Sequence, residues 1–329
     1  LTTAVIYLTT GLEYKLSVMV SILIYHALSL VFIFLIGNQF FGPTVGLLAA
    51  LLLGTGDTYI ELGISIRPIT LGLAILSSLA YLVLRQKKTL TWTPLIFLSI
   101  GVLIWTHTIA ALAMSIVLLI FWASFLIYRR FYIDRHHQIS VRSTLCALFA
   151  VAMLGWWTFS TDFFIQTLAQ VIKSGFVIEQ WKESALSNAY LSQYELESSI
   201  NMIGTFLYYG LSIVGCLYML SKKHRNKSFF ALVLTSYTFT ALTFAALISS
   251  GLLSSRWFPC SQLMAALPTA VGLLALIGSA KGRFNLTMIL FVLILIMSFL
   301  MISKPGTNID NPIYSTNTMI RTALTEAEV

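Results

Sequence analysis

Long apolar runs separated by short polar segments cover almost the whole chain. Runs of about 17 to 25 residues are long enough to cross a bilayer as helices. Hydrophobic residues make up 58% of the sequence and charged residues only 10%, with a mean hydropathy of +0.87. The pattern predicts an all-α polytopic membrane protein with about ten transmembrane helices, at 16–37, 43–60, 68–84, 92–106, 108–128, 143–161, 199–220, 228–250, 258–279 and 284–302.

Basic residues concentrate in every second loop. Cytoplasmic loops collect Lys and Arg, so these loops are predicted to be cytoplasmic. The opposite side then carries 11 of the 12 acidic residues and the C-terminus, on the outside of the plasma membrane. The net charge of +8 reflects this topology and contact with anionic membrane lipid, and no nucleic acid partner is expected. Thirteen of the 20 basic residues lie in these predicted cytoplasmic loops: Arg85, Lys87, Lys88, Arg129, Arg130, Arg135, Arg142, Lys222, Lys223, Arg225, Lys227, Lys281 and Arg283.

Both ends of the sequence lie on the predicted outer side. The chain begins with Leu1 and leaves Glu13 outside before its first long span, so an earlier helix and an outer loop are expected upstream. Residues 1–302 form the predicted transmembrane domain, which is N-terminally truncated. Residues 303–329 are polar and outside, and Thr325 with Glu328 has the spacing of a helix capping box. This segment is predicted to begin a soluble domain.

The stretch "GTGDTYIELGISIRP" places three charges between two apolar runs, at the outer membrane boundary. Asp57 and Glu61 are four residues apart and share one face of a helical extension. Two converging carboxylates suit Mg²⁺ or Mn²⁺, and such a cation bridges to phosphate oxygens. Arg67 can pair with the carboxylates or bind a phosphate itself. The alternative is a solvated loop with an ordinary surface ion pair.

Two further polar residues are predicted at the same membrane depth. His107, in "LIWTHTIAAL", lies at a tight turn between two short spans. It either makes a hydrogen bond that stabilises the turn or contacts the substrate. Arg256 lies at the outer end between two long spans, beside Trp257. It is either an interfacial anchor or a ligand for the phosphate of a lipid-linked substrate. The shared depth predicts that Asp57, Glu61, His107 and Arg256 converge on one outward-opening cavity.

Other segments leave their alternatives open. The outer segment from Asp162 to Ser198 predicts an amphipathic interfacial helix, followed by an aromatic and acidic stretch that suits either sugar binding or a plain surface loop. The three cysteines lie in predicted spans and do not have metal-binding spacing. We therefore expect them to act as small buried hydrophobic residues.

The run "IGNQFFGPTVGLLAALLLGTGDTYIELGISIRPITLGLAILSSLAYLVLRQKK", followed by "LSIGVLIWTHTIAAL", resembles the GT-C class of polytopic glycosyltransferases. The resemblance is to archaeal and bacterial members related to oligosaccharyltransferases and to polyprenyl-phosphate-sugar mannosyltransferases. It covers Leu16 to Leu118 most clearly, and the later helices fit by topology alone.

The resemblance implies a glycosyltransferase with its active site on the outer face. The donor would be a polyprenyl-phosphate-linked sugar, and the acceptor a protein or a glycan. The principal catalytic carboxylate of that family lies in the first outer loop, which is expected upstream of Leu1. A second acidic site is matched by Asp57 and Glu61, and a late outer arginine that contacts donor phosphate is matched by Arg256. The alternatives are a transporter or flippase of lipid-linked precursors, and a lipid-linked glycan polymerase or ligase.

Overall fold

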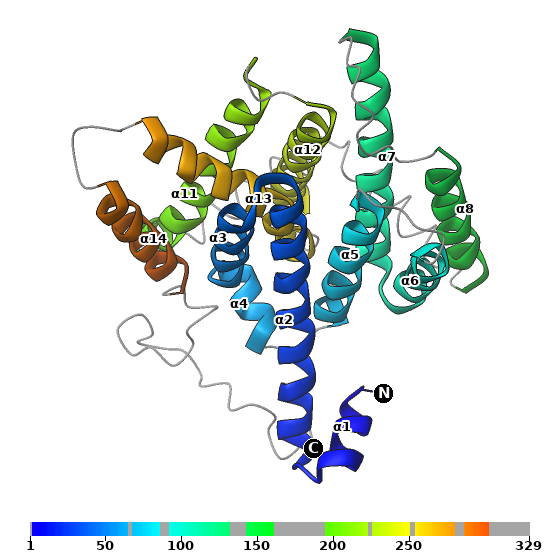
Figure 1. Cartoon of the computed structure of the whole chain (residues 1–329). Coiled ribbons are helices and arrows are strands. Elements are labelled where there is room, and N and C mark those ends of the chain that lie inside the picture. The colour runs from blue at the N-terminus through cyan, green and yellow to red at the C-terminus, as the bar shows by residue number, and fades with distance from the viewer. Residues whose placement is uncertain are drawn as a thin grey trace.

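The computed structural model describes residues 2–64, 68–85, 92–131, 143–160, 195–222, 226–250, 254–279 and 286–302. Within these ranges the regular structure is helical, as predicted, and Figure 1 shows the helices gathered into one bundle. The helices are α1 (Thr2–Thr10), α2 (Tyr14–Phe41), α3 (Pro43–Gly54), α4 (Asp57–Ile64), α5 (Pro68–Leu84), α6 (Thr93–Thr106), α7 (Thr108–Phe131), α8 (Ser143–Ser160), α11 (Glu195–Leu220), α12 (Lys227–Ser250), α13 (Ser254–Ser279) and α14 (Leu286–Ile302).

The helices are those of a multi-pass membrane protein, but the predicted count of ten spans is not confirmed. Among the described residues five helices are long and apolar enough to cross a membrane, and six if the bent pair α3 and α4 counts as one. Three further apolar helices are shorter, at Ile69–Leu84, Thr93–Thr106 and Ser143–Phe159. The predicted cytoplasmic and outer sides stay predictions, and the predicted helix after Asp162 and the segment 303–329 lie outside the described residues.

The predicted span at 43–60 is not one straight helix, because the helix breaks inside it. α3 ends at Gly54, α4 begins at Asp57, and their axes differ in direction by 69°. The Gly56 amide donates to the Leu53 carbonyl at 3.0 Å, which closes a tight turn. Glycine residues on both sides of Thr55 lower the cost of leaving the helical path, since glycine is the least favourable helix former after proline. The break brings Asp57 to the start of a new helix.

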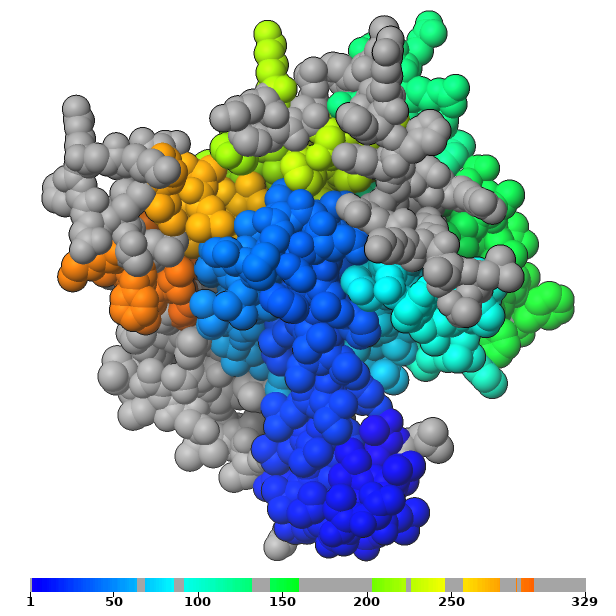
Figure 2. Space-filling model, in the orientation of Figure 1, coloured from blue at the N-terminus to red at the C-terminus, as the bar shows by residue number. Residues whose placement is uncertain are grey.

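The short helix α1 was not predicted. Gly11 ends it in the left-handed conformation, with φ at 67° and its amide bonded to the Tyr7 carbonyl at 3.0 Å. Thr3 and Ser21 are hydrogen-bonded through their hydroxyl groups, which ties α1 to α2. Figure 2 shows α1 and the adjacent end of α2 standing clear of the other described helices.

α13 forms the centre of the bundle, between α3, α11 and α12. Most of its residues from Trp257 to Gly278 are buried. Glycine residues allow its close approach to α11: a methyl group added at Gly215 would lie 1.8 Å from the Pro268 carbonyl oxygen. Small residues at such crossings let helix backbones touch without a gap. The three cysteines are buried and free, as the sequence predicts: Cys146, Cys216 and Cys260.

Candidate functional site

The candidate site is a buried polar cluster at the break between α3 and α4. Asp57, the first residue of α4, is only 6% exposed. The alternative of a solvated loop therefore does not fit this side chain, and its position at the outer membrane boundary stays a prediction. A carboxylate at the first helical position is favoured by the partial positive charge of the helix N-terminus. Burial of a charge in a membrane protein is costly unless other groups bind it, so the partners of Asp57 define the site.

Two side chains from distant parts of the sequence bind the Asp57 carboxylate. The side-chain amide of Gln262, in α13, donates to Oδ1. The Thr205 hydroxyl, in α11, donates to Oδ2 at 3.2 Å. Hydrogen bonds to a carboxylate are each worth roughly 1.5 to 3 kcal/mol, more than bonds between neutral groups. Three helices therefore meet at one carboxylate.

Gln262 is the central residue of this cluster. It is fully buried, and its amide oxygen accepts a hydrogen bond from the Thr58 hydroxyl while its amide nitrogen binds Asp57. Gly56 makes room for it, because a methyl group at that position would lie 3.0 Å from the Gln262 amide oxygen. The backbone carbonyl of Gln262 accepts from the Tyr208 hydroxyl at 2.8 Å. The amide oxygen and nitrogen of this side chain are thus both bound by α4, and its backbone carbonyl is bound by α11.

A histidine of α2 packs against a tyrosine of α4. The ring of His26, in α2, lies 5.3 Å from the ring of Tyr59, measured between centroids, and Tyr59 is 1% exposed. Glu61 follows one turn after Asp57 on α4 and is half-buried. The two carboxylates therefore share a short helix, as the sequence predicts.

His107 has a structural role in the described contacts. It lies between α6 and α7, as predicted, and its Nδ1 accepts the Ala110 amide at 3.1 Å. This bond caps one of the unpaired amides at the start of α7. The Cβ atom of His107 packs against α5 at Gly72, where an added methyl group would lie 3.0 Å from it. Substrate contact by His107 stays a prediction.

The two arginines can be placed only in part. Arg256 belongs to α13, six residues before Gln262, which corresponds to roughly 9 Å of helix rise. Its side chain lies outside the described residues, as does all of Arg67. Convergence of Arg256 with Asp57 in one cavity is not tested, although α13 carries both Arg256 and the principal partner of Asp57.

The described residues leave the metal site at Asp57 and Glu61 a prediction. They contain no group of three His, Cys, Asp or Glu side chains placed to hold a metal ion. Each oxygen of the Asp57 carboxylate accepts one hydrogen bond, from Gln262 or from Thr205. The proposed role of Asp57 as a ligand for Mg²⁺ or Mn²⁺ therefore stays a prediction.

Sequence reasoning missed Gln262, Thr205 and His26. An uncharged glutamine inside an apolar helix was the available signal, because its amide has to find partners within the bundle. The sequence contains no information on which partners these are, since Gln262 lies 205 residues after Asp57.

Two solved structures of the oligosaccharyltransferase of Archaeoglobus fulgidus are similar to this chain. The AglB structure in complex with an inhibitory peptide and a dolichol-phosphate is 15% identical with a TM-score of 0.42, over 87% of this chain and 43% of that chain. The apo form is 14% identical with a TM-score of 0.45, over 90% and 44%. The chain thus spans less than half the length of either.

No protein-family model matches the chain, and no curated protein does. At these identities and TM-scores the structural similarity does not establish a family, and the GT-C resemblance stays a prediction. The functional argument therefore rests on the residues themselves.

Proposed function

We propose that this chain is part of a membrane glycosyltransferase of the GT-C type. It would move a sugar from a polyprenyl-phosphate-linked donor to a protein or glycan acceptor on the outer face of the membrane. The observation that carries the proposal is the buried carboxylate of Asp57, bound by Gln262 and Thr205 at a break between two apolar helices. Ionisable groups buried in membrane helices mark functional sites by default.

The fixed carboxylate suits the acceptor side of the reaction. A hydroxyl or amide acceptor has to be oriented toward the sugar and has to lose a proton as it attacks. In the proposed reaction the acceptor attacks the anomeric carbon, and the bond from that carbon to the phosphate oxygen breaks. Asp57 orients the acceptor by accepting its hydrogen bond. The proton passes to the principal carboxylate, which the family resemblance places upstream of Leu1.

Arg256 suits the donor side. The leaving group is a polyprenyl phosphate, and negative charge develops on its bridging oxygen as the sugar departs. A guanidinium group at the depth of the lipid headgroups stabilises this charge through two parallel hydrogen bonds. Arg256 belongs to the same helix as Gln262, so the phosphate ligand and the partner of Asp57 are connected by less than two helical turns. Arg67 is a second candidate ligand for this phosphate.

The dolichol-phosphate in the archaeal oligosaccharyltransferase structure is a lipid of the proposed donor class. The proposal does not rest on it.

A transporter or flippase is the second candidate and has less support. Such a protein places charges along a pathway through the middle of its spans. Among the described residues with assigned burial, Asp57 is the one charged side chain that is buried, and it lies at a helix break. A glycan polymerase or ligase shares the chemistry and differs mainly in needing arginine-rich outer loops, which this sequence lacks.

The test is sugar transfer from a polyprenyl-phosphate donor by the full-length protein that contains this chain. Arg256→Ala removes a charge-assisted contact worth roughly 1.5 to 3 kcal/mol, so donor affinity should fall about ten- to a hundred-fold. Arg256→Lys should recover part of it, because the charge survives without the planar fork. Asp57→Asn should lower kcat, with the donor KM little changed.

Metal concentration separates the remaining interpretations. If Asp57 binds the acceptor, added Mg²⁺ or Mn²⁺ should not restore the Asp57→Asn variant, whereas a lost metal ligand is partly compensated by higher metal concentration. Normal rates in both the Asp57 and the Arg256 variants, at normal expression, would contradict the proposal. Asp57 would then be a structural buried carboxylate and Arg256 an interfacial anchor.

A further inference from the structure

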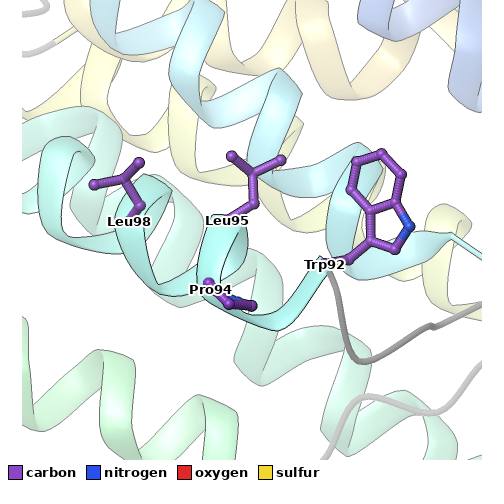
Figure 3. A pocket seen from close by; sticks show the side chains of 4 residues that line it. All are labelled: Trp92, Pro94, Leu95 and Leu98. Atoms are coloured by element: carbon purple, nitrogen blue, oxygen red, sulfur yellow. The ribbon is translucent and has the colours of Figure 1, made fainter.

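An open groove lies at the start of α6, away from the cluster around Asp57. Its volume is about 620 Å³, and it is lined by Trp92, Pro94, Leu95 and Leu98. Figure 3 shows Leu95 and Leu98 projecting from α6 on the same side as the Trp92 indole. The spacing of three residues places these side chains on one face of the helix. Leu98 is 63% exposed and Leu95 40%, so the groove has an accessible apolar wall.

A cation is held beside this wall. Arg85 follows directly after the end of α5, and its guanidinium carbon lies 4.2 Å from the centroid of the Trp92 ring. Such a cation–π contact stabilises the position of the guanidinium by roughly 0.5 to 1 kcal/mol at an exposed site. This contact adds no negative charge to the guanidinium. No described acidic side chain forms an ion pair with Arg85.

The sequence predicts that this groove lies at a membrane surface. α5 and α6 are consecutive apolar helices, and the predicted topology places the chain between them on the cytoplasmic side. Arginine and tryptophan both favour the headgroup zone. From Arg85 the apolar wall runs along α6 past Leu95 to Leu98, away from the turn and toward the hydrocarbon region. The groove therefore offers a charge at headgroup level and an apolar surface next to acyl-chain level.

We propose that this groove binds one anionic phospholipid of the bilayer, with its phosphate on Arg85 and an acyl chain along Leu95 and Leu98. The charge and the apolar wall together select this occupant. A soluble anion would gain nothing from the leucine wall, and a phospholipid without net charge gains less from the uncompensated guanidinium. The proposal is independent of sugar transfer, because the groove and the Asp57 cluster share no residue.

Lipid retention tests it. The complete chain is incorporated into bilayer discs that contain equal amounts of phosphatidylglycerol and phosphatidylcholine. It is then extracted into mild detergent, and the lipids still bound are measured by native mass spectrometry. Wild-type protein should retain one phosphatidylglycerol in preference to phosphatidylcholine. Arg85→Ala should weaken retention about tenfold, and Arg85→Lys less. Arg130→Ala, at an exposed arginine in the last turn of α7, is the matched control and should retain lipid like wild type.

Two results would overturn the proposal. One is equal retention of the two lipids by the wild type, and the other is unchanged phosphatidylglycerol retention in Arg85→Ala. A second variant covers the case in which Arg85→Ala does not fold. Leu98→Asn keeps the charge of Arg85 and changes an exposed side chain. It should lower phosphatidylglycerol retention several-fold, because the acyl chain loses part of its apolar wall. Unchanged retention in Leu98→Asn would make Arg85 and Trp92 an interfacial anchor only. Inorganic phosphate should not displace the bound lipid.

Discussion

Replacement of Gln262 by leucine should destabilise the bundle through Asp57. Leucine fills a similar volume but removes two side-chain hydrogen bonds, one donated to the carboxylate and one accepted from Thr58. The bond to the charged group is worth roughly 1.5 to 3 kcal/mol and the neutral one about 0.5 to 1.5 kcal/mol. The expected cost is about 2 to 4 kcal/mol, because Asp57 stays buried with one partner fewer.

A double-mutant cycle isolates the charged bond. In an Asp57→Asn background Gln262 binds a neutral amide, so its replacement should cost about 1 to 1.5 kcal/mol less than in the wild type. Gln39→Leu is the matched control. This glutamine donates to the Leu84 carbonyl at 2.7 Å, a neutral bond between the ends of α2 and α5, and its loss should cost about 1 kcal/mol.

The buried cysteines provide the assay. A thiol-reactive fluorogenic dye reports unfolding of the detergent-solubilised protein, because Cys146, Cys216 and Cys260 become accessible only when the bundle opens. Gln262→Leu should lower the apparent Tm by several degrees, clearly more than Gln39→Leu. If Gln262→Leu has the same effect with aspartate and with asparagine at position 57, the two side chains are not coupled, and the reasoning about the site is refuted.

Three further predictions concern packing, capping and topology. Gly215→Ala should lower the apparent Tm strongly, because the added methyl group meets the backbone of α13. Gly101→Ala adds a methyl group with nothing within 4 Å and should be neutral or slightly stabilising. Equal effects of the two substitutions would contradict the close crossing of α11 and α13. His107→Ala should cost about 1 kcal/mol and His107→Asn less, measured by the same dye, because asparagine can still accept the capping hydrogen bond. A cysteine placed at residue 315 should react with an impermeant reagent from outside and one at residue 221 should not; the reverse pattern would invert the predicted topology.

The sequence predicted the helices well and the helix break poorly. Segments such as 68–84 and 108–128 match α5 and α7 closely, because a bilayer requires long apolar helices and the hydropathy pattern records them directly. The span at 43–60 is apolar from Val45 to Leu53, but the two glycines around Thr55 allow the chain to turn by 69° before Asp57. Apolar composition does not distinguish a straight span from a broken one.

The site was predicted in part for a related reason. Asp57 stood out because charge is rare in this chain, and its location between two apolar runs was visible. The burial of Asp57 could not be predicted, because it depends on Gln262 and Thr205, which lie in helices more than 140 residues further along the chain. For His107 the sequence left a structural role and substrate contact open. The structure records a hydrogen bond from the Ala110 amide of α7 to Nδ1, and substrate contact stays a prediction.

The long sequence separation within the polar cluster has a consequence for biosynthesis. At roughly 5 to 20 residues per second, Gln262 is synthesised about 10 to 40 s after Asp57, because the two are 205 residues apart. Thr205 is synthesised first, 148 residues after Asp57, and the Gln262 bond is the last to become possible. The enclosed state of Asp57 can therefore form only after α13 has been synthesised.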